Sequence, residues 1–210
     1  MTTFPNEKVQ HIIQETFPNF LEHWVDKYPT FEEAWNLCRS GATMVGILLE
    51  YAPDSVDLHW VGLRSAKRAL GILTQVNQKP EFQRSLDIKE IWLRGKLSDS
   101  VLEYNRNIVT PLVLEADEAA KVSMGDDGSL NPIFGLDMFI ARSVLNSNHS
   151  DPFSAVLATT SAASAFCITN RQHFNDELLR QANDVREFFP ATFFSPPVVR
   201  KSRYEREWVI

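Results

Sequence analysis

The sequence has few cysteines, few glycines and no long hydrophobic run, and each shortage excludes a class of protein. Its two cysteines, Cys38 and Cys167, form neither a disulfide framework nor a zinc pattern, so we expect reduced thiols buried in the core. The chain has eight glycines, and none of them belongs to a phosphate-binding loop of the GxGxxG or GxxxxGK(S/T) type, so the sequence shows no nucleotide-binding motif. The longest apolar run, residues 44–49, is far shorter than the roughly 18 residues of a membrane helix.

Positive charge is also in the minority. The chain has 21 Lys and Arg against 27 Asp and Glu, for a net charge of −6. Nucleic-acid binding usually needs a concentrated positive face, so nucleic acid is a disfavoured partner, whereas a basic protein would be attracted. The first residues lack the basic flank and apolar core of a secretory signal, so we expect a cytoplasmic protein without a membrane segment.

What the sequence does contain is apolar residues at helical spacing. Leu, Ile, Val and Phe make up 61 of the 210 residues, which is enough for a folded core. Hairpin turns and alternating β-branched runs are almost absent. We therefore predict an all-α fold of eight or nine antiparallel helices, packed as a bundle or an irregular stack over residues 1–190. Prolines turn the remainder, residues 191–210, into a predicted extended tail.

Local signals predict where several helices begin and bend. Thr30 and Glu33 form a capping box, so a helix begins at residue 31. Pro18 interrupts the first helix, and Pro111 bends or splits the helix over residues 100–122. The alanine-rich helix behind Pro152 is expected near the bundle centre, because small residues allow neighbouring helices to approach closely.

Two tryptophans, Trp35 and Trp92, lie on the apolar stripes of their helices. We expect both of them to be buried.

Patterns for catalysis or metal binding are scarce. No two of the five histidines lie within four residues of each other, so helical metal pairs are absent. The carboxylate clusters fit a helix start, a polar loop and a solvated helix face. We therefore predict no catalytic residue, no cofactor and no metal ion, with a site assembled across distant helices as the open alternative.

Two segments are candidate partner-binding surfaces. The acidic candidate comprises Glu115, Glu118, Asp126 and Asp127. The second candidate, in the basic and aromatic tail, comprises Arg203, Tyr204 and Trp208. Arginine and aromatic residues are enriched at protein interfaces, although this tail could instead dock back on the helices. We rank the acidic candidate first, because a loop between two long helices is better held than a proline-rich terminus.

Three stretches resemble a family of small helical bacterial proteins, the immunity proteins of polymorphic toxin systems. They read TFEEAWNLCRSGATMVGILLEYA (residues 30–52), SLDIKEIWLRGKLSDSVL (85–102) and LLRQANDVREFFP (178–190). The matching positions are Ala34, Trp35, Cys38, Met44, Trp92, Gly95, Gln181, Ala182, Val185, Arg186, Glu187 and Pro190. Thr43 departs from the family, which usually has an aromatic residue there, and the middle helices are less alanine-rich.

The resemblance, over about residues 30–190, implies a non-catalytic protein that binds a cognate toxin stoichiometrically and neutralises it. A helical scaffold or adaptor in a bacterial defence or regulatory complex is the alternative. We transfer no contact residue from the family to this chain.

Overall fold

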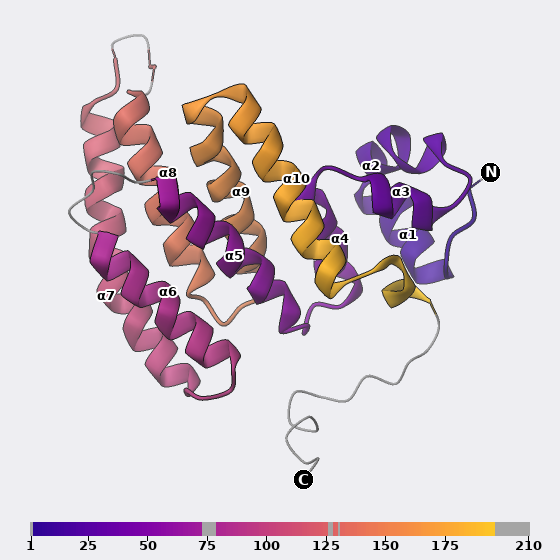
Figure 1. The fold of residues 1–210 in the computed structure, drawn as a ribbon, viewed down its shortest axis with the longest axis horizontal. Helices are drawn as coiled ribbons and strands as arrows, with labels where there is room; N and C mark the ends of the chain where they lie inside the picture. Colours follow the sequence, from indigo (N-terminus) through magenta and orange to yellow (C-terminus); the bar gives the residue numbers. More distant parts are fainter. Residues whose placement is uncertain (1, 73–78, 126–127, 130, 196–210) are drawn as a thin grey trace. The chain divides into compact units, whose positions relative to one another are not determined.

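The computed structural model describes residues 2–72, 79–125, 128–129 and 131–195, and most of these residues are helical. In chain order the helices are α1 (Glu7–Thr16), α2 (Pro18–His23), the 3-10 helix η1 (Val25–Lys27), α3 (Phe31–Leu37), α4 (Gly41–Tyr51), α5 (Asp57–Ile72), α6 (Lys79–Leu93), α7 (Asp99–Val122), α8 (Pro132–Ser147), α9 (Phe153–Thr169), α10 (Arg171–Phe188) and the 3-10 helix η2 (Ala191–Phe194). The described part has no sheet beyond one isolated bridge, between Thr3 and Thr30. The predicted all-α class is confirmed (Figure 1).

The chain divides into two compact units. Unit 1 combines Met1–Cys38 with Arg186–Ile210, and unit 2 is Arg39–Val185. The expectation of one domain over residues 1–190 stays a prediction. None of the helices in the described residues is long and apolar enough to cross a membrane.

The helix boundaries follow local sequence signals. The backbone N–H of Glu33 donates to the Thr30 hydroxyl at 3.2 Å, so the predicted cap at the start of α3 is confirmed. Pro18 opens α2 and divides the first segment into two short helices, also as predicted. Gly95, with φ at 74°, ends the α6 segment in the left-handed conformation that favours glycine.

Pro111 lies inside α7 and does not split it. A proline removes the hydrogen bond to the carbonyl four residues earlier, which here belongs to Asn107. Both residues are exposed, so water can satisfy that carbonyl and the helix continues to Val122.

Unit 1 has an aromatic core built from both ends of the chain. The indole N–H of Trp35 donates to the carbonyl of Phe189 at 2.9 Å, and its ring lies 4.8 Å from that of Phe194, edge to face. Arg186 donates to two carbonyls at the end of α3, at 2.7 and 3.2 Å. The first residues of the predicted tail therefore form η2, with Phe194 fully buried, and are not extended.

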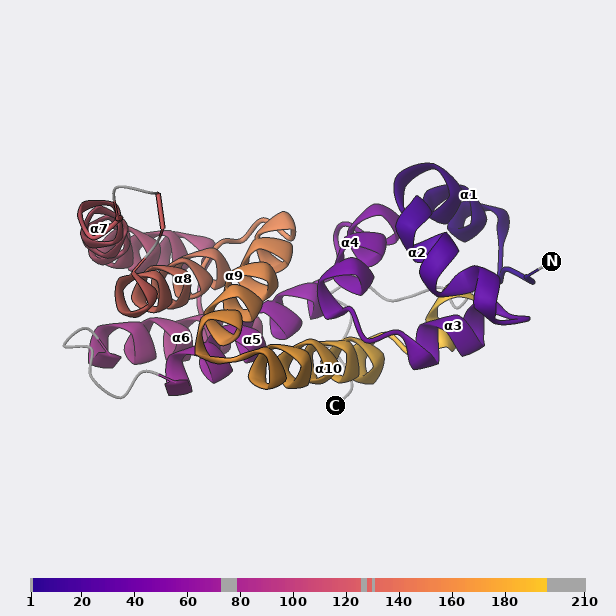
Figure 2. The ribbon, with the colours of Figure 1, turned by 90° about the horizontal axis from the view of Figure 1, so that it is seen from above.

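Unit 2 has α5, α8 and α9 at its centre (Figure 1). The alanines of α9 are buried, as predicted, and they allow close packing on α5. A Cβ placed on Gly62 of α5 would lie 3.1 Å from the Cα of Ala155 in α9. Helix α7 packs on α6 and α8 at the edge of the unit, which Figure 2 shows from above. Trp92 is buried, as expected.

The two cysteines have different environments. Cys38 is fully buried, which confirms its predicted core position. Cys167 is exposed, so its predicted core position is wrong. It follows the buried Ala163 by one helical turn, but the last residues of α9 are partly or fully exposed, so the apolar stripe ends before Cys167.

Candidate partner-binding surface

The outward side of α7 exposes an unusual amount of apolar surface. Of the thirteen large hydrophobic side chains exposed among the described residues, five belong to this one helix. They are Val101, Tyr104, Ile108, Leu114 and Val122. The opposite side of the helix buries its own apolar stripe, which includes Leu102, Val109 and Val113. Three of them, Val101, Tyr104 and Ile108, are spaced three and four residues apart and so lie on the same side of the helix, which makes that side a candidate interaction site.

Two of the predicted acidic residues share this outward side. Glu115 and Glu118 are exposed, and they continue the three- and four-residue spacing of Tyr104 and Ile108. The side chain of Glu118 is 66% exposed and accepts a hydrogen bond from Lys121 at 2.6 Å. This hydrogen bond and the charge of Glu118 raise the pKa of Lys121. We call Val101, Tyr104, Ile108, Pro111, Leu114, Glu115, Glu118 and Val122 the α7 outer face.

The neighbouring carboxylate, Asp117, has a structural role. Arg142 of α8 donates to both of its oxygens, at 2.9 and 3.1 Å, and the Asp117 side chain is only 19% exposed. Bidentate pairs of this kind fix geometry as well as charge. The pair therefore links α7 to α8 and fixes the position of the helix that carries the α7 outer face.

The remaining predicted site residues lie outside the described residues. These are Asp126 and Asp127 in the loop, and Arg203, Tyr204 and Trp208 in the tail. Their assignment to a partner surface stays a prediction.

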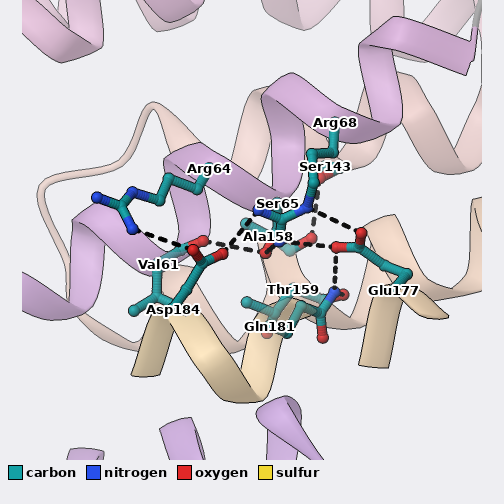
Figure 3. A network of polar contacts seen from close by, with 10 residues as sticks. All are labelled: Val61, Arg64, Ser65, Arg68, Ser143, Ala158, Thr159, Glu177, Gln181 and Asp184. Atoms are coloured by element: carbon teal, nitrogen blue, oxygen red, sulfur yellow. Dashed lines mark hydrogen bonds and ion pairs between the residues drawn. The ribbon is translucent and has the colours of Figure 1, made fainter. Parts of the chain in front are cut away.

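A network of charged side chains joins α5 to α10 in unit 2. Figure 3 shows Arg64 and Arg68 of α5 directed toward Glu177 and Asp184 of α10. Arg68 donates to both oxygens of Glu177, at 2.8 and 2.9 Å, and to Asp184 at 2.7 Å. Arg64 donates to the other oxygen of Asp184 at 3.0 Å. Two cations thus face two carboxylates.

The charges of this network compensate one another. Burial alone would lower the pKa of Arg68, but its hydrogen bonds and attraction to Glu177 and Asp184 raise it overall. The buried amide of Gln181 donates to Glu177 and to the carbonyl of Thr159, both at 3.0 Å. Because the two cations and two carboxylates already pair with one another, the network holds α10 on α5 and leaves no unbalanced charge for a ligand to neutralise, whereas Gln181 Oε1 is a buried acceptor with no hydrogen-bond partner among the described residues.

A second polar cluster lies where α6, α7 and the end of α8 meet. The buried Lys89 donates to the carbonyl of His149 at 2.6 Å and lies 3.9 Å from the ring centre of Trp92. Arg106 of α7 lies 3.1 Å from His149 Nδ1. Burial, with Arg106 and Lys89 nearby, lowers the pKa of His149, although Asp151 acts in the opposite direction. A neutral His149 can accept the hydrogen bond from Arg106. The cluster therefore connects the residues that follow α8 to α6 and α7.

A cavity of about 330 Å³ lies along α10. It is lined by Arg39, Gln172, Asn175, Asp176, Leu178 and Leu179. Its charged groups have opposite signs, and Gln172 already donates to Asp176 at 2.8 Å. No group of three or more His, Cys, Asp or Glu among the described residues could hold a metal ion.

No family model matches the chain, and the searches of curated proteins and of solved structures also found no match. The outward apolar residues of α7 are what the sequence analysis missed. The sequence could have predicted an exposed apolar side, because α7 has more apolar residues than one buried stripe accommodates.

Proposed function

We propose that this protein is a non-catalytic cytoplasmic binding protein, an immunity protein that sequesters and neutralises a cognate toxin. The observation that carries the proposal is the α7 outer face, where exposed apolar side chains and two carboxylates occupy one side of a supported helix. The apolar residues supply area to bury and the carboxylates supply attraction to a basic partner. The resemblance of residues 30–190 to immunity proteins supports a toxin as the binding partner.

The proposal is tested with the protein encoded by the open reading frame next to this gene. We expect this protein to be a toxin, to form a one-to-one complex with the full chain, and to lose its toxic activity in that complex. The variant Glu115→Lys/Glu118→Lys should slow association by about tenfold at low salt, with a smaller effect at high salt, because steering between exposed charges is screened.

The matched control is Glu15→Lys/Glu22→Lys, which changes the net charge equally but places the new charges on α1 and α2. It should bind at nearly the wild-type rate. A chain that ends at Phe194 should also bind normally, whereas loss of binding on this truncation would assign the interface to the tail. Equal effects of the two charge reversals would reject the α7 outer face.

A helical scaffold or adaptor is the second candidate function, and the division of the chain into two compact units favours it. Two units offer separate surfaces for two partners. A scaffold would form a ternary complex without changing the activity of either partner, whereas an immunity protein would abolish the activity of its one partner. Analytical ultracentrifugation together with a toxicity assay separates the two functions.

A further inference from the structure

The α9 helix carries no charge on any side. None of its 17 residues, Phe153–Thr169, is Asp, Glu, Lys or Arg. A helix of this kind is normally buried all round. Helix α9 packs on α8, α5 and α4, yet one of its sides faces solvent. Phe153 is 50% and Leu157 40% exposed, and Thr160 and Cys167 are exposed as well. This uncharged side is therefore a candidate contact surface.

The outward residues of α9 have the spacing of a helix that packs against a second helix. Together with the half-buried Ser164, they occupy positions 153, 157, 160, 164 and 167. The intervals alternate between four and three residues, which keeps all five side chains on one side of the helix. They extend over about 21 Å, at roughly 1.5 Å per residue. We call these five residues the α9 seam.

The hydroxyl groups of the α9 seam already have acceptors within their own helix. Thr160 donates to the carbonyl of Val156 at 2.8 Å, and Ser164 donates to the carbonyl of Thr160 at 3.0 Å. Covering a hydroxyl group is costly mainly when it loses its hydrogen-bond partner, and these two keep theirs. A second helix that covers the α9 seam therefore needs no charged or polar group to match it.

A second copy of the α9 seam is complementary in size to the first when the two helices are antiparallel. In that arrangement Thr160 lies opposite its own copy, at a two-fold axis. Leu157 then lies opposite Ser164, and Phe153 lies opposite Cys167. Each large side chain thus meets a small one, as in well-packed helix pairs. In a parallel pair, Phe153 would meet Phe153 at one end and Cys167 would meet Cys167 at the other, so the helices could not approach evenly.

The charges just beyond the two ends of α9 favour the same arrangement. Asp151 precedes the helix and Arg171 follows it, and both are exposed. One oxygen of Asp151 accepts a hydrogen bond from the backbone N–H of Phe153 at 3.0 Å, whereas Arg171 has no ion-pair partner among the described residues. Around the two-fold axis, Asp151 of one copy would lie close to Arg171 of the other. In a parallel pair, each of these charges would instead meet its own copy.

We infer that two copies of this chain associate through the α9 seam as an antiparallel pair with two-fold symmetry. The seam is short for a specific interface, so the pair dissociates on dilution. The α9 seam shares no residue with the α7 outer face. The inference therefore goes beyond the proposed function and does not depend on it.

Disulfide formation tests the register of the pair. Phe153→Cys places a thiol opposite Cys167 of the other copy, and mild oxidation should convert this variant into a covalent dimer in a non-reducing gel. The wild-type chain should stay monomeric in that gel, because its two Cys167 thiols would lie about 21 Å apart along the seam. Phe153→Cys/Cys167→Ser should also stay monomeric. The matched control is Tyr104→Cys, which places an exposed thiol on α7 and should form no covalent dimer.

Sedimentation equilibrium measures the association without any new thiol. The wild-type chain should show a monomer–dimer equilibrium at about 0.15 M salt, where repulsion between distant charges is screened. Thr160→Glu places two carboxylates against each other at the two-fold axis and should raise the dissociation constant by about tenfold or more. Asn107→Glu adds the same charge at an exposed position of α7 and should leave the dissociation constant unchanged. Circular dichroism establishes that each variant is folded.

Four results would overturn the inference. They are a wild-type chain that stays monomeric at every concentration, a wild-type chain that links covalently through Cys167, a Phe153→Cys variant that links no faster than Tyr104→Cys, and equal dissociation constants for Thr160→Glu and Asn107→Glu. No toxin is present in these experiments, so such a failure is distinct from failure of the proposed function.

Discussion

Replacing Gly41 with alanine tests how closely the start of α4 approaches α10 within unit 2. A Cβ at Gly41 would lie 2.3 Å from the Cβ of Gln181, 2.8 Å from its backbone carbon and 2.9 Å from the nitrogen of Ala182. All three separations are shorter than van der Waals contact, and two involve backbone atoms that cannot rotate away. The two helices would have to move apart.

The expected cost of Gly41→Ala follows from this geometry. Overpacking a core typically costs about 1–3 kcal/mol, and a clash with backbone belongs at the upper end. The better helix propensity of alanine returns less than about 1 kcal/mol. We therefore expect the free energy of unfolding to fall by about 2–3 kcal/mol, measured by urea denaturation with an unchanged m-value.

Gly71→Ala is the matched control. Gly71 is exposed near the end of α5, and nothing lies within 4 Å of the position its Cβ would take. The substitution should leave stability unchanged or raise it by about 0.5 kcal/mol through helix propensity. If Gly41→Ala has the same free energy of unfolding as Gly71→Ala, the inferred close contact between α4 and α10 is rejected.

Three further outcomes are expected. Glu177→Gln should destabilise the chain by about 2 kcal/mol, because the partly buried Arg68 loses one of its two carboxylate partners, and Arg68→Met in the same chain should restore part of the loss in urea denaturation. Stability should fall as the pH decreases below about 6.5, because the lowered pKa of His149 means that the unfolded state binds its proton first; His149→Gln should flatten this dependence in denaturation curves between about pH 7 and 5. With a thiol reagent, Cys167 should react in the native protein while Cys38 reacts only on unfolding; equal rates would refute their different burial.

Features that depend on neighbouring residues in the sequence were predictable. The cap at Thr30, the division at Pro18 and the burial of Trp35 each follow from a pattern within a few residues. The all-α class follows from the same periodicity repeated along the chain. These signals are local, so they do not depend on which helices become neighbours.

Features that depend on tertiary neighbours were not predictable. Glu177 and Lys89 are fully buried, although their residue types usually lie at the surface. Their partners are far away in sequence: Arg68 lies 109 positions from Glu177, and His149 lies 60 positions from Lys89. The α7 outer face is a related case, because periodicity shows that a helix has two apolar stripes but only the packing of α6 and α8 decides which stripe stays exposed.

Unit 1 joins residues from the two ends of the chain, and this arrangement constrains its biosynthesis. Trp35 and Phe189, which are hydrogen-bonded in the native state, are 154 positions apart. At roughly 5–20 residues per second, a ribosome needs about 8–30 s to synthesise that interval. Residues 39–185 can begin to fold in that time, whereas the aromatic residues of α3 wait for Phe189 and Phe194 to emerge. The aromatic core of unit 1 can therefore be completed only after Phe189 and Phe194 have been synthesised, later than the first contacts within residues 39–185.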